Sequence, residues 1–140
     1  MDLLERMVAL WTEPLPADDE AAVALARELY ADPVTINGVL FELRALVGRG
    51  RAQQRALAEQ RLEIIDRIEL PGKLVIVFRE LARHVGPLPT VLGELPATGK
   101  MIERQSMEVA TLQDGRIVDV RFLSDDLGML SRLDAIKLKA

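Results

Sequence analysis

The spacing of apolar residues predicts helices in the first part of the chain. Leu4, Met7, Val8 and Trp11 recur at intervals of three and four residues, the pattern of one face of an amphipathic helix over residues 2–11. Such a helix has an apolar stripe that must pack against another element. We therefore expect it to cover part of a sheet.

Two more helices are expected before the sheet. The acidic residues at 18–20 favour a helix start, because negative charge is stabilised at that end of the helix dipole, and Tyr30 closes the helix. The Asp32-Pro33 step follows, and residues 34–38 form a short strand or turn. The apolar residues of the third helix are Val39, Leu40, Leu43, Leu46 and Val47. The Gly48-Arg49-Gly50 step is interpreted as a helix end, with a polar helical stretch following it to Leu57.

The pattern changes to strands from Leu62 onwards. Apolar and charged residues alternate up to Leu70, Pro71-Gly72 makes a turn, and residues 74–78 are apolar on both faces, as in a central strand. Residues 84–99 are rich in proline and glycine and are expected to form a loop. A loop of this length is typical of a lid or a binding loop.

The last part of the chain reads as a hairpin followed by a short helix. Asp114-Gly115 separates strands over 101–112 and 116–124, because a tight hairpin turn needs backbone at positive φ. Beyond the second strand the apolar spacing becomes helical. Asp125 thus lies where a long strand meets a helix, a place that suits either a functional carboxylate or a helix cap.

This order of elements predicts a single α+β domain over residues 1–140. Helices come first, then a run of antiparallel strands, which places the helices on one face of a curved sheet. The other face of the sheet then needs cover. Because strands 73–81 and 116–124 carry alternating apolar residues, we expect a homodimer that packs through the sheet.

The composition and the absence of certain motifs argue against several classes of function. A formal net charge of −4, scattered arginines and five aromatic residues argue against nucleic-acid binding. One histidine and no cysteine leave no expected metal site, and no glycine-rich nucleotide motif supports a cofactor. No apolar run reaches membrane-spanning length, and the first residues lack a signal-peptide pattern, so a cytoplasmic location is expected.

The strand over 101–112 is unusually polar. Alternation places Glu103, Gln105, Met107 and Val109 on one face and Arg104, Ser106 and Glu108 on the other. Such a strand is either at the edge of a sheet or has polar side chains that line a cavity. Arg79 follows the apolar central strand and either pairs with Glu103 or points into the pocket mouth.

Asp125 is the strongest candidate for chemistry. By parity it shares a face with Leu123 and Arg121, and if that face lines a pocket, desolvation would raise the carboxyl pKa and make it a general acid or base. The competing interpretation is that Asp125 or Asp126 caps the final helix. Val118, Val120 and Phe122 also look more like the core-facing set of this strand than their neighbours do.

Three stretches resemble a known family. Residues 114–130, DGRIVDVRFLSDDLGML, resemble the end of the SnoaL-like polyketide cyclases, a branch of the nuclear transport factor 2-like superfamily. In that family a final strand carries His-Trp, three residues, Asp and then a Leu-Gly-(Leu/Met)-Leu helix start. Asp125 matches the Asp, whereas Val120 and Arg121 stand in the place of His-Trp. The stretches 83–88 and 97–100 resemble the family's His-x-Gly-Pro loop and Thr-Gly strand start.

The resemblance implies a cone-shaped α+β barrel with a pocket between helices and sheet. It implies a cofactor-free cyclase acting on a hydrophobic, polyketide-type small molecule. Two alternatives stay open: a shape-driven intramolecular cycloaddition with little acid–base chemistry, and a non-catalytic binding or scaffold module. The candidate catalytic residues are Asp125 and His84. The candidate substrate-binding residues are Trp11, Tyr30, Asn37, Arg79, Met101, Gln105, Arg121 and Leu123.

Overall fold

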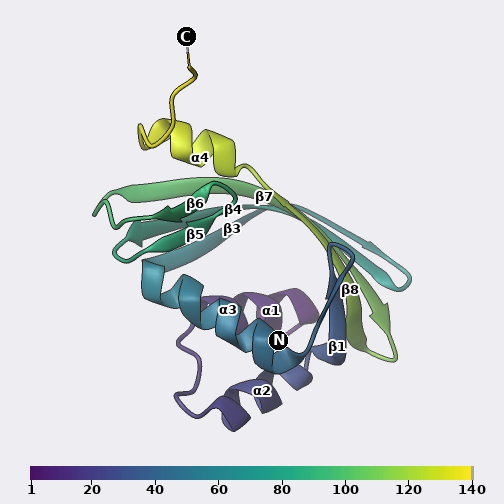
Figure 1. The fold of residues 1–140 in the computed structure, drawn as a ribbon. Helices are drawn as coiled ribbons and strands as arrows, with labels where there is room; N and C mark the ends of the chain where they lie inside the picture. Colours follow the sequence, from purple (N-terminus) through teal and green to yellow (C-terminus); the bar gives the residue numbers. More distant parts are fainter. Residues whose placement is uncertain (140) are drawn as a thin grey trace.

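The computed structural model describes residues 1–139, which form four helices and eight strands (Figure 1). The helices are α1 (Leu3–Thr12), α2 (Asp19–Arg27), α3 (Leu43–Ala56) and α4 (Asp126–Arg132). The strands are β1 (Tyr30–Ile36), β2 (Val39–Phe41), β3 (Leu57–Leu70), β4 (Lys73–His84), β5 (Leu88–Thr90), β6 (Gly93–Leu95), β7 (Met101–Gln113) and β8 (Arg116–Ser124).

Six strands form one curved sheet in the order β2-β1-β8-β7-β4-β3, and β5 and β6 form a separate hairpin. In Figure 1 the sheet bends over α1, α2 and α3, and α4 lies beyond β7. This is the expected α+β, cone-shaped arrangement. The sheet is open, because β2 and β3 remain as edges. It is also mixed, so the prediction of a purely antiparallel sheet is wrong: β1 runs parallel to β8.

The larger core lies between the first three helices and one end of the sheet. Its buried side chains include Leu4 and Met7 of α1, Leu43 of α3 and Ile76 of β4. A second core lies at the other end of the sheet, where Met129 and Leu130 of α4 pack with Ala82, Leu88 and Ile102. The middle of the concave face lies between these two cores. It carries polar side chains.

Helix α4 occupies the position along β7 that β8 leaves empty. Beyond Ser124 the backbone N–H of Asp125 still donates to the carbonyl of Gln105, at 2.9 Å. At the end of α4, the Arg132 guanidinium donates to the carbonyl of Glu103, at 2.5 Å. The edge of β7 is therefore covered after β8 ends, and α4 is fixed beside it.

The helix boundaries differ from the predicted ones at three places. Tyr30 does not close α2 but begins β1, where it is buried, and Val39 and Leu40 belong to β2 instead of a helix. Helix α3 continues through Gly48 and Gly50. Gly50 lies against Trp11, and a Cβ at this position would come within 2.6 Å of the Trp11 ring. Gly50 is thus required for close packing and does not end the helix.

The turns in the second half of the chain are as expected. Asp114 and Gly115 have φ of 52° and 79°, and Gly72, in the β3–β4 turn, has φ of 72°. The 84–99 stretch is less irregular than a plain loop, because it contains the β5–β6 hairpin. Strand β7 lies between β4 and β8, so the interpretation of it as an edge strand is wrong. Its polar side chains therefore lie in the interior of the sheet.

Candidate active site

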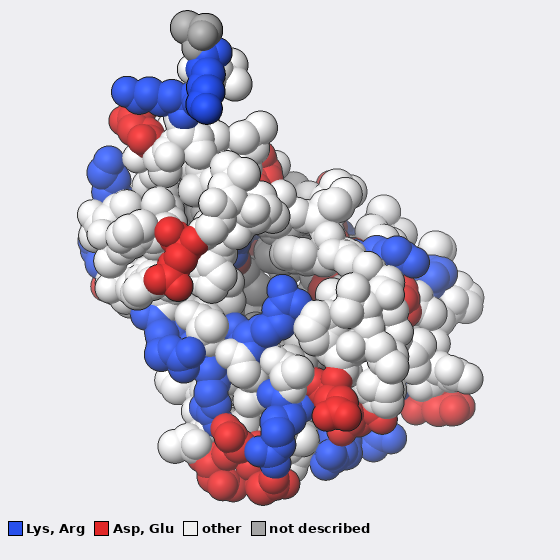
Figure 2. Space-filling model, viewed as in Figure 1, with Lys and Arg blue, Asp and Glu red and all other residues white. Residues whose placement is uncertain are grey.

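The face of the molecule seen in Figure 2 is hollowed at its centre. By comparison with Figure 1, the hollow lies above α3, between the β5–β6 hairpin and the β1–β2 hairpin, with the sheet behind it. The concave-face residues of β4, β7 and β8 form that part of the sheet. Arg104, Ser106 and Glu108 of β7 each bring a polar side chain to this face, and each defines one rung together with the residues that pair with it.

The first rung is a buried ion network. Arg104 of β7 donates to the Glu80 carboxylate of β4 at 3.2 Å and to Asp126 of α4 at 3.2 Å. The Arg104 and Glu80 side chains are only 9% and 11% exposed, so the interaction is well shielded from water. The two carboxylates raise the pKa of Arg104 against the opposing effect of burial, and the guanidinium stays charged. This network joins α4 to the sheet.

The second rung is a pair of hydroxyls. Ser106 of β7 lies opposite Ser124 of β8, and their Oγ atoms are 3.0 Å apart. Ser106 is buried and Ser124 is half-buried. One hydrogen bond between two hydroxyls uses one hydrogen, so the pair retains a second hydrogen that can be donated to a bound oxygen.

The third rung contains Glu108, which has no polar partner among the described residues. Glu108 lies between Ile76 of β4 and Phe122 of β8 and is half-buried. Burial raises the pKa of its carboxyl from about 4.5 to about 7. At neutral pH the group is therefore present in both protonation states, which is the requirement for a general acid–base catalyst.

Tyr30 lies near Glu108, and Trp11 contacts Tyr30. The Trp11 indole donates to the Tyr30 hydroxyl at 2.9 Å, and the two rings are 6.0 Å apart. Burial, and then the charge of Glu108, raise the pKa of Tyr30, which keeps the phenol neutral. The structure thus brings two of the predicted substrate-binding residues together, but Tyr30 is buried in the core.

Asp125 is the N-cap residue of α4. Capping was the second of the two roles expected for it, beside catalysis. Its carboxylate accepts from the backbone N–H of Gly128 at 2.9 Å, at the start of α4, and its side chain is exposed. The parity argument placed it with Leu123 and Arg121. Those two side chains point to the outer face, because Val120 and Phe122 are the ones that face the core. The structure gives Asp125 a structural role.

His84 is fully buried at the end of β4, on the same face of the strand as Glu80 and Ala82. Its Nδ1 lies 2.9 Å from the Thr98 hydroxyl and accepts from the Thr98 backbone N–H. This pattern assigns the hydrogen to Nε2, which has no partner among the described residues. His84 fixes the segment that returns from β6 to β7.

Asn37 connects the β1–β2 turn to β8. Its side-chain amide donates to the Phe122 carbonyl at 3.0 Å and accepts from the Phe122 N–H at 2.8 Å. Asn37 has φ of 49°, a conformation that asparagine tolerates better than most residues. Its contacts are those of a backbone clamp.

The remaining predicted binding residues lie on the outer face of the sheet. Arg79 pairs with Glu63 at 2.8 Å and with Glu103 at 3.2 Å, and the expected Arg79–Glu103 contact is confirmed. The outward-facing side chains that were expected to line the pocket are Met101, Gln105, Arg121 and Leu123. They are separated from the hollow by the sheet itself.

Sequence reasoning missed Glu108 as a candidate. The signal was present, since alternation grouped Glu108 with Arg104 and Ser106 on one face of the strand. What the sequence lacked was the identity of the inward face. Arg104 has two carboxylate partners and Glu108 has none, and this difference appears only in three dimensions.

Two further crevices lie on the helical side of the molecule. One, of about 410 Å³, lies between the end of α1, the second half of α3 and the start of β3. The other, of about 650 Å³, lies between α2, the β1–β2 hairpin and the start of α3. Within residues 1–139, no three His, Asp or Glu side chains gather as a metal site requires. None of the helices in this range has the length and apolar character that crossing a membrane requires.

Comparison with solved structures identifies the fold. TsrD from Streptomyces laurentii superposes with a TM-score of 0.77 at 19% identity, over 96% of this chain and 93% of that one. A SnoaL-like polyketide cyclase from Agrobacterium tumefaciens superposes with a TM-score of 0.72 at 14% identity, over 95% and 98%. No protein-family model matches the chain, and no curated protein matches it by sequence. The chain has the fold of the SnoaL-like polyketide cyclases, as the sequence resemblance implied.

Proposed function

We propose that the protein is a cofactor-independent cyclase that closes a ring in a polyketide-type intermediate within the central hollow. The fold supports this proposal, since a SnoaL-like polyketide cyclase shares it over nearly its whole length. The observation that carries it is Glu108, a carboxyl without a polar partner on the concave face, whose pKa is raised to about 7. Acid–base catalysis is most efficient when the catalytic pKa lies near the working pH.

The proposed reaction is an intramolecular aldol closure. The Glu108 carboxylate removes a proton from the carbon next to a carbonyl, and the resulting enolate attacks a second carbonyl of the same chain. A carbon–carbon bond forms, and the proton returns from Glu108 to the new alkoxide. The Ser106–Ser124 pair donates its remaining hydrogen to the oxygen that carries the developing charge. These residues lie two positions from Glu108 along the strand, about 7 Å, which leaves room for substrate between them.

The aromatic residues around Glu108 support an apolar substrate. Phe78 and Phe122 lie 6.3 Å apart on neighbouring rungs, and Tyr30, with Trp11 against it, lies near Glu108. Such walls bind a flexible carbon chain and bring its ends close, which by itself accelerates ring closure. Because Glu108 adds a titratable group to this surface, we place acid–base closure ahead of shape-driven cycloaddition.

The test uses a linear diketone whose intramolecular aldol addition gives a cyclic β-hydroxy ketone, and product formation is followed by liquid chromatography. Wild-type protein should accelerate closure, and the rate should rise with pH through about 7 as Glu108 loses its proton. Glu108→Gln should lower the rate by about a hundredfold or more. Glu103→Gln, on the outer face of the same strand, is the matched control and should keep the rate.

Asp125→Asn separates this proposal from the catalytic role first expected for Asp125. We expect the rate to change by less than about threefold, since the residue caps α4. A rate that is abolished by Asp125→Asn and kept by Glu108→Gln would refute the role of Glu108. A rate that is flat with pH would favour the shape-driven cycloaddition, and the absence of any turnover would favour a binding module.

A further inference from the structure

Helix α3 carries an unusual excess of positive charge. Its 14 residues include four arginines and no acidic residue. The whole chain, in contrast, has a formal net charge of −4. In Figure 2, Lys and Arg side chains follow the course of α3 below the hollow, and one lies at the lower edge of the hollow. The partners of each arginine show which charges are available to a ligand.

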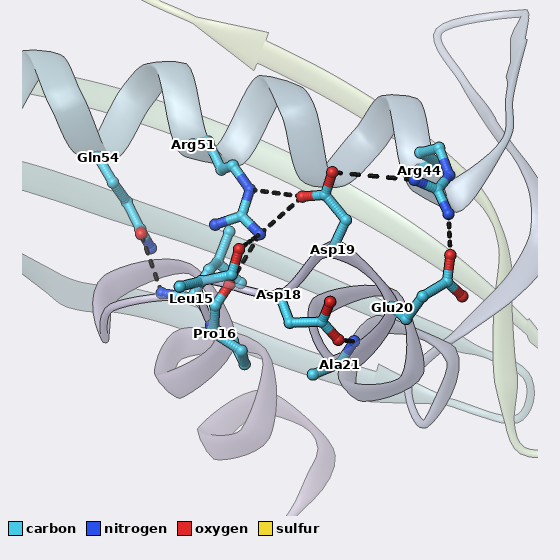
Figure 3. Close-up of polar contacts among 10 residues, drawn as sticks. Leu15, Pro16, Asp18, Asp19, Glu20, Ala21, Arg44, Arg51 and Gln54 are labelled. Carbon is cyan, nitrogen blue, oxygen red and sulfur yellow. Dashed lines mark hydrogen bonds and ion pairs between the residues drawn. The ribbon is translucent and has the colours of Figure 1, made fainter.

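Two of the four arginines are neutralised by α2 (Figure 3). Arg51 contacts the Asp19 carboxylate at 2.9 Å, and Arg44 contacts Asp19 at 3.8 Å and also pairs with Glu20. Arg51 further donates to the Pro16 carbonyl at 2.7 Å. These two arginines hold α2 against α3, so their charges are already used within the fold.

Arg55 lies at the other end of the helix. It is in the last turn, where positive charge is favoured by the helix dipole, and it borders the crevice of about 410 Å³ together with Thr12, Pro14 and Gln60. That crevice lies on the α1 side of α3. Arg55 makes no ion pair among the described residues. Because it borders this crevice, it does not face the β1–β2 side of the helix, where the hollow is.

Arg49 lies on the side of α3 that faces the β1–β2 hairpin, one of the elements around the hollow. Its guanidinium lies over the Phe41 ring of β2, 4.9 Å from the ring centre, which places it between α3 and the β1–β2 hairpin. In the described part of the chain it makes no ion pair. A guanidinium stacked on a ring is held in one orientation and keeps the N–H groups of its edge available for a planar acceptor.

The charges inside the hollow determine which end of a charged ligand can enter it. Arg104 is already matched by two carboxylates, and Glu108, once ionised, repels a second negative charge. A carboxylate would therefore be unfavourable deep in the hollow and favourable at Arg49. We infer that Arg49 binds the carboxylate of a linear acid substrate, with the apolar chain directed inward to Phe78 and Phe122. This inference rests on the proposed function, because it concerns the same hollow.

The test compares two probes of equal chain length by equilibrium dialysis, octanoate and octan-1-ol. Wild-type protein should bind octanoate about tenfold more tightly than octan-1-ol. Arg49→Gln should remove this preference by weakening octanoate alone, and Arg49→Lys, which keeps charge but not the planar fork, should retain part of it. Arg55→Gln is the matched control, since it removes the other unpaired arginine of α3, and it should keep the preference. Melting curves establish that each variant is folded.

Three results would overturn the inference: no preference for octanoate in the wild type, an unchanged preference in Arg49→Gln, or an equal loss in Arg55→Gln. Failure of both probes to bind would count against it as well. Because the dialysis involves no turnover, it is independent of diketone closure by Glu108. The substrate orientation and the proposed reaction can therefore fail separately.

Discussion

The two faces of β7 and its neighbours show how one set of strands carries two different surfaces. On the concave face Arg104 is enclosed between two carboxylates, and its side chain is 9% exposed. On the outer face Arg79 has the same number of carboxylate partners, at similar distances, but its side chain is 39% exposed. The two networks therefore differ in their contribution to the free energy of unfolding, because water screens the Arg79 network and not the Arg104 network.

The largest expected effect comes from removing the enclosed cation. Arg104→Ala leaves Glu80 and Asp126 without their partner in a shielded site, which should cost about 3–5 kcal/mol of unfolding free energy. Arg79→Ala is the matched change on the outer face and should cost far less, because water screens the exposed pairs. Urea unfolding of both variants measures the difference. Equal losses would show that enclosure does not distinguish the two faces.

The next effect concerns the pH dependence of stability. Glu108 has a pKa of about 7 in the folded chain and near 4.5 when unfolded, so the folded state holds its proton over a range where the unfolded state has lost it. The contribution of this group to folding stability is fully present below pH 4.5 and is lost as the pH rises through 7, by about 3 kcal/mol in total. Glu108→Gln should remove this loss.

Melting temperature against pH for wild type and Glu108→Gln measures this effect. The two curves should diverge from pH 5 to 8, with the variant the more stable at the upper end. Glu103→Gln, which faces outward from the same strand, should follow the wild type. Parallel curves for Glu108→Gln and wild type would show that the Glu108 carboxyl is as well solvated as a surface group.

A smaller effect is expected for association. The outer face presents a continuous apolar set: Ile68, Val75, Val77, Met107, Val109 and Leu123. The Arg79 network beside it carries both signs of charge, which suits contact with a second copy related by a twofold axis. We propose a homodimer through this face. Leu123→Lys should weaken dimerisation by about tenfold, or 1.4 kcal/mol, in analytical ultracentrifugation.

Leu127→Lys is the control for this change. Leu127 is exposed on α4 and is not part of the outer sheet face, so its replacement should leave dimerisation unchanged. A monomer in the wild type at micromolar concentration would refute the dimer. So would an equal weakening by both lysine variants, because a general charge effect would then explain the result.

The smallest effect is expected at Asp125. Asp125→Ala removes the acceptor for the Gly128 N–H and should cost about 1 kcal/mol, a few degrees of melting temperature. Asp126→Ala should cost more, because Asp126 also neutralises Arg104. If Asp125→Ala is the more damaging of the two, Asp125 has a role beyond the cap.

Local patterns were sufficient to predict much of the fold. The 2–11 helix, the Pro71-Gly72 and Asp114-Gly115 turns and the change from strand to helix at Asp125 each depend on residues close in sequence. The sequence left two positions open for Arg79, a pair with Glu103 and the pocket mouth, and the structure shows the pair.

The inward face of the C-terminal hairpin could not be predicted. Alternation shows which residues share a face, but β7 has polar residues on both of its faces. The β7–β8 register shifts between the Thr111–Asp119 and Leu112–Ile117 pairs, so Ile117 and Val120 of β8 are both buried although their parity differs. Parity grouped Arg121 with Leu123 correctly, but the expected site took their face as the inward one, and the structure places Val120 and Phe122 inward instead.

The position of β1 has a consequence for the growing chain. Asn37 binds the backbone of Phe122, 85 residues further along, and β1, which pairs with β2 on one side, pairs with β8 on the other. During synthesis the first four elements leave the ribosome long before β8 exists, whereas β3 and β4 can pair at once. Until β8 is synthesised, the edge of β1 that faces away from β2 therefore has no partner strand. This part of the nascent protein depends longest on protection from aggregation.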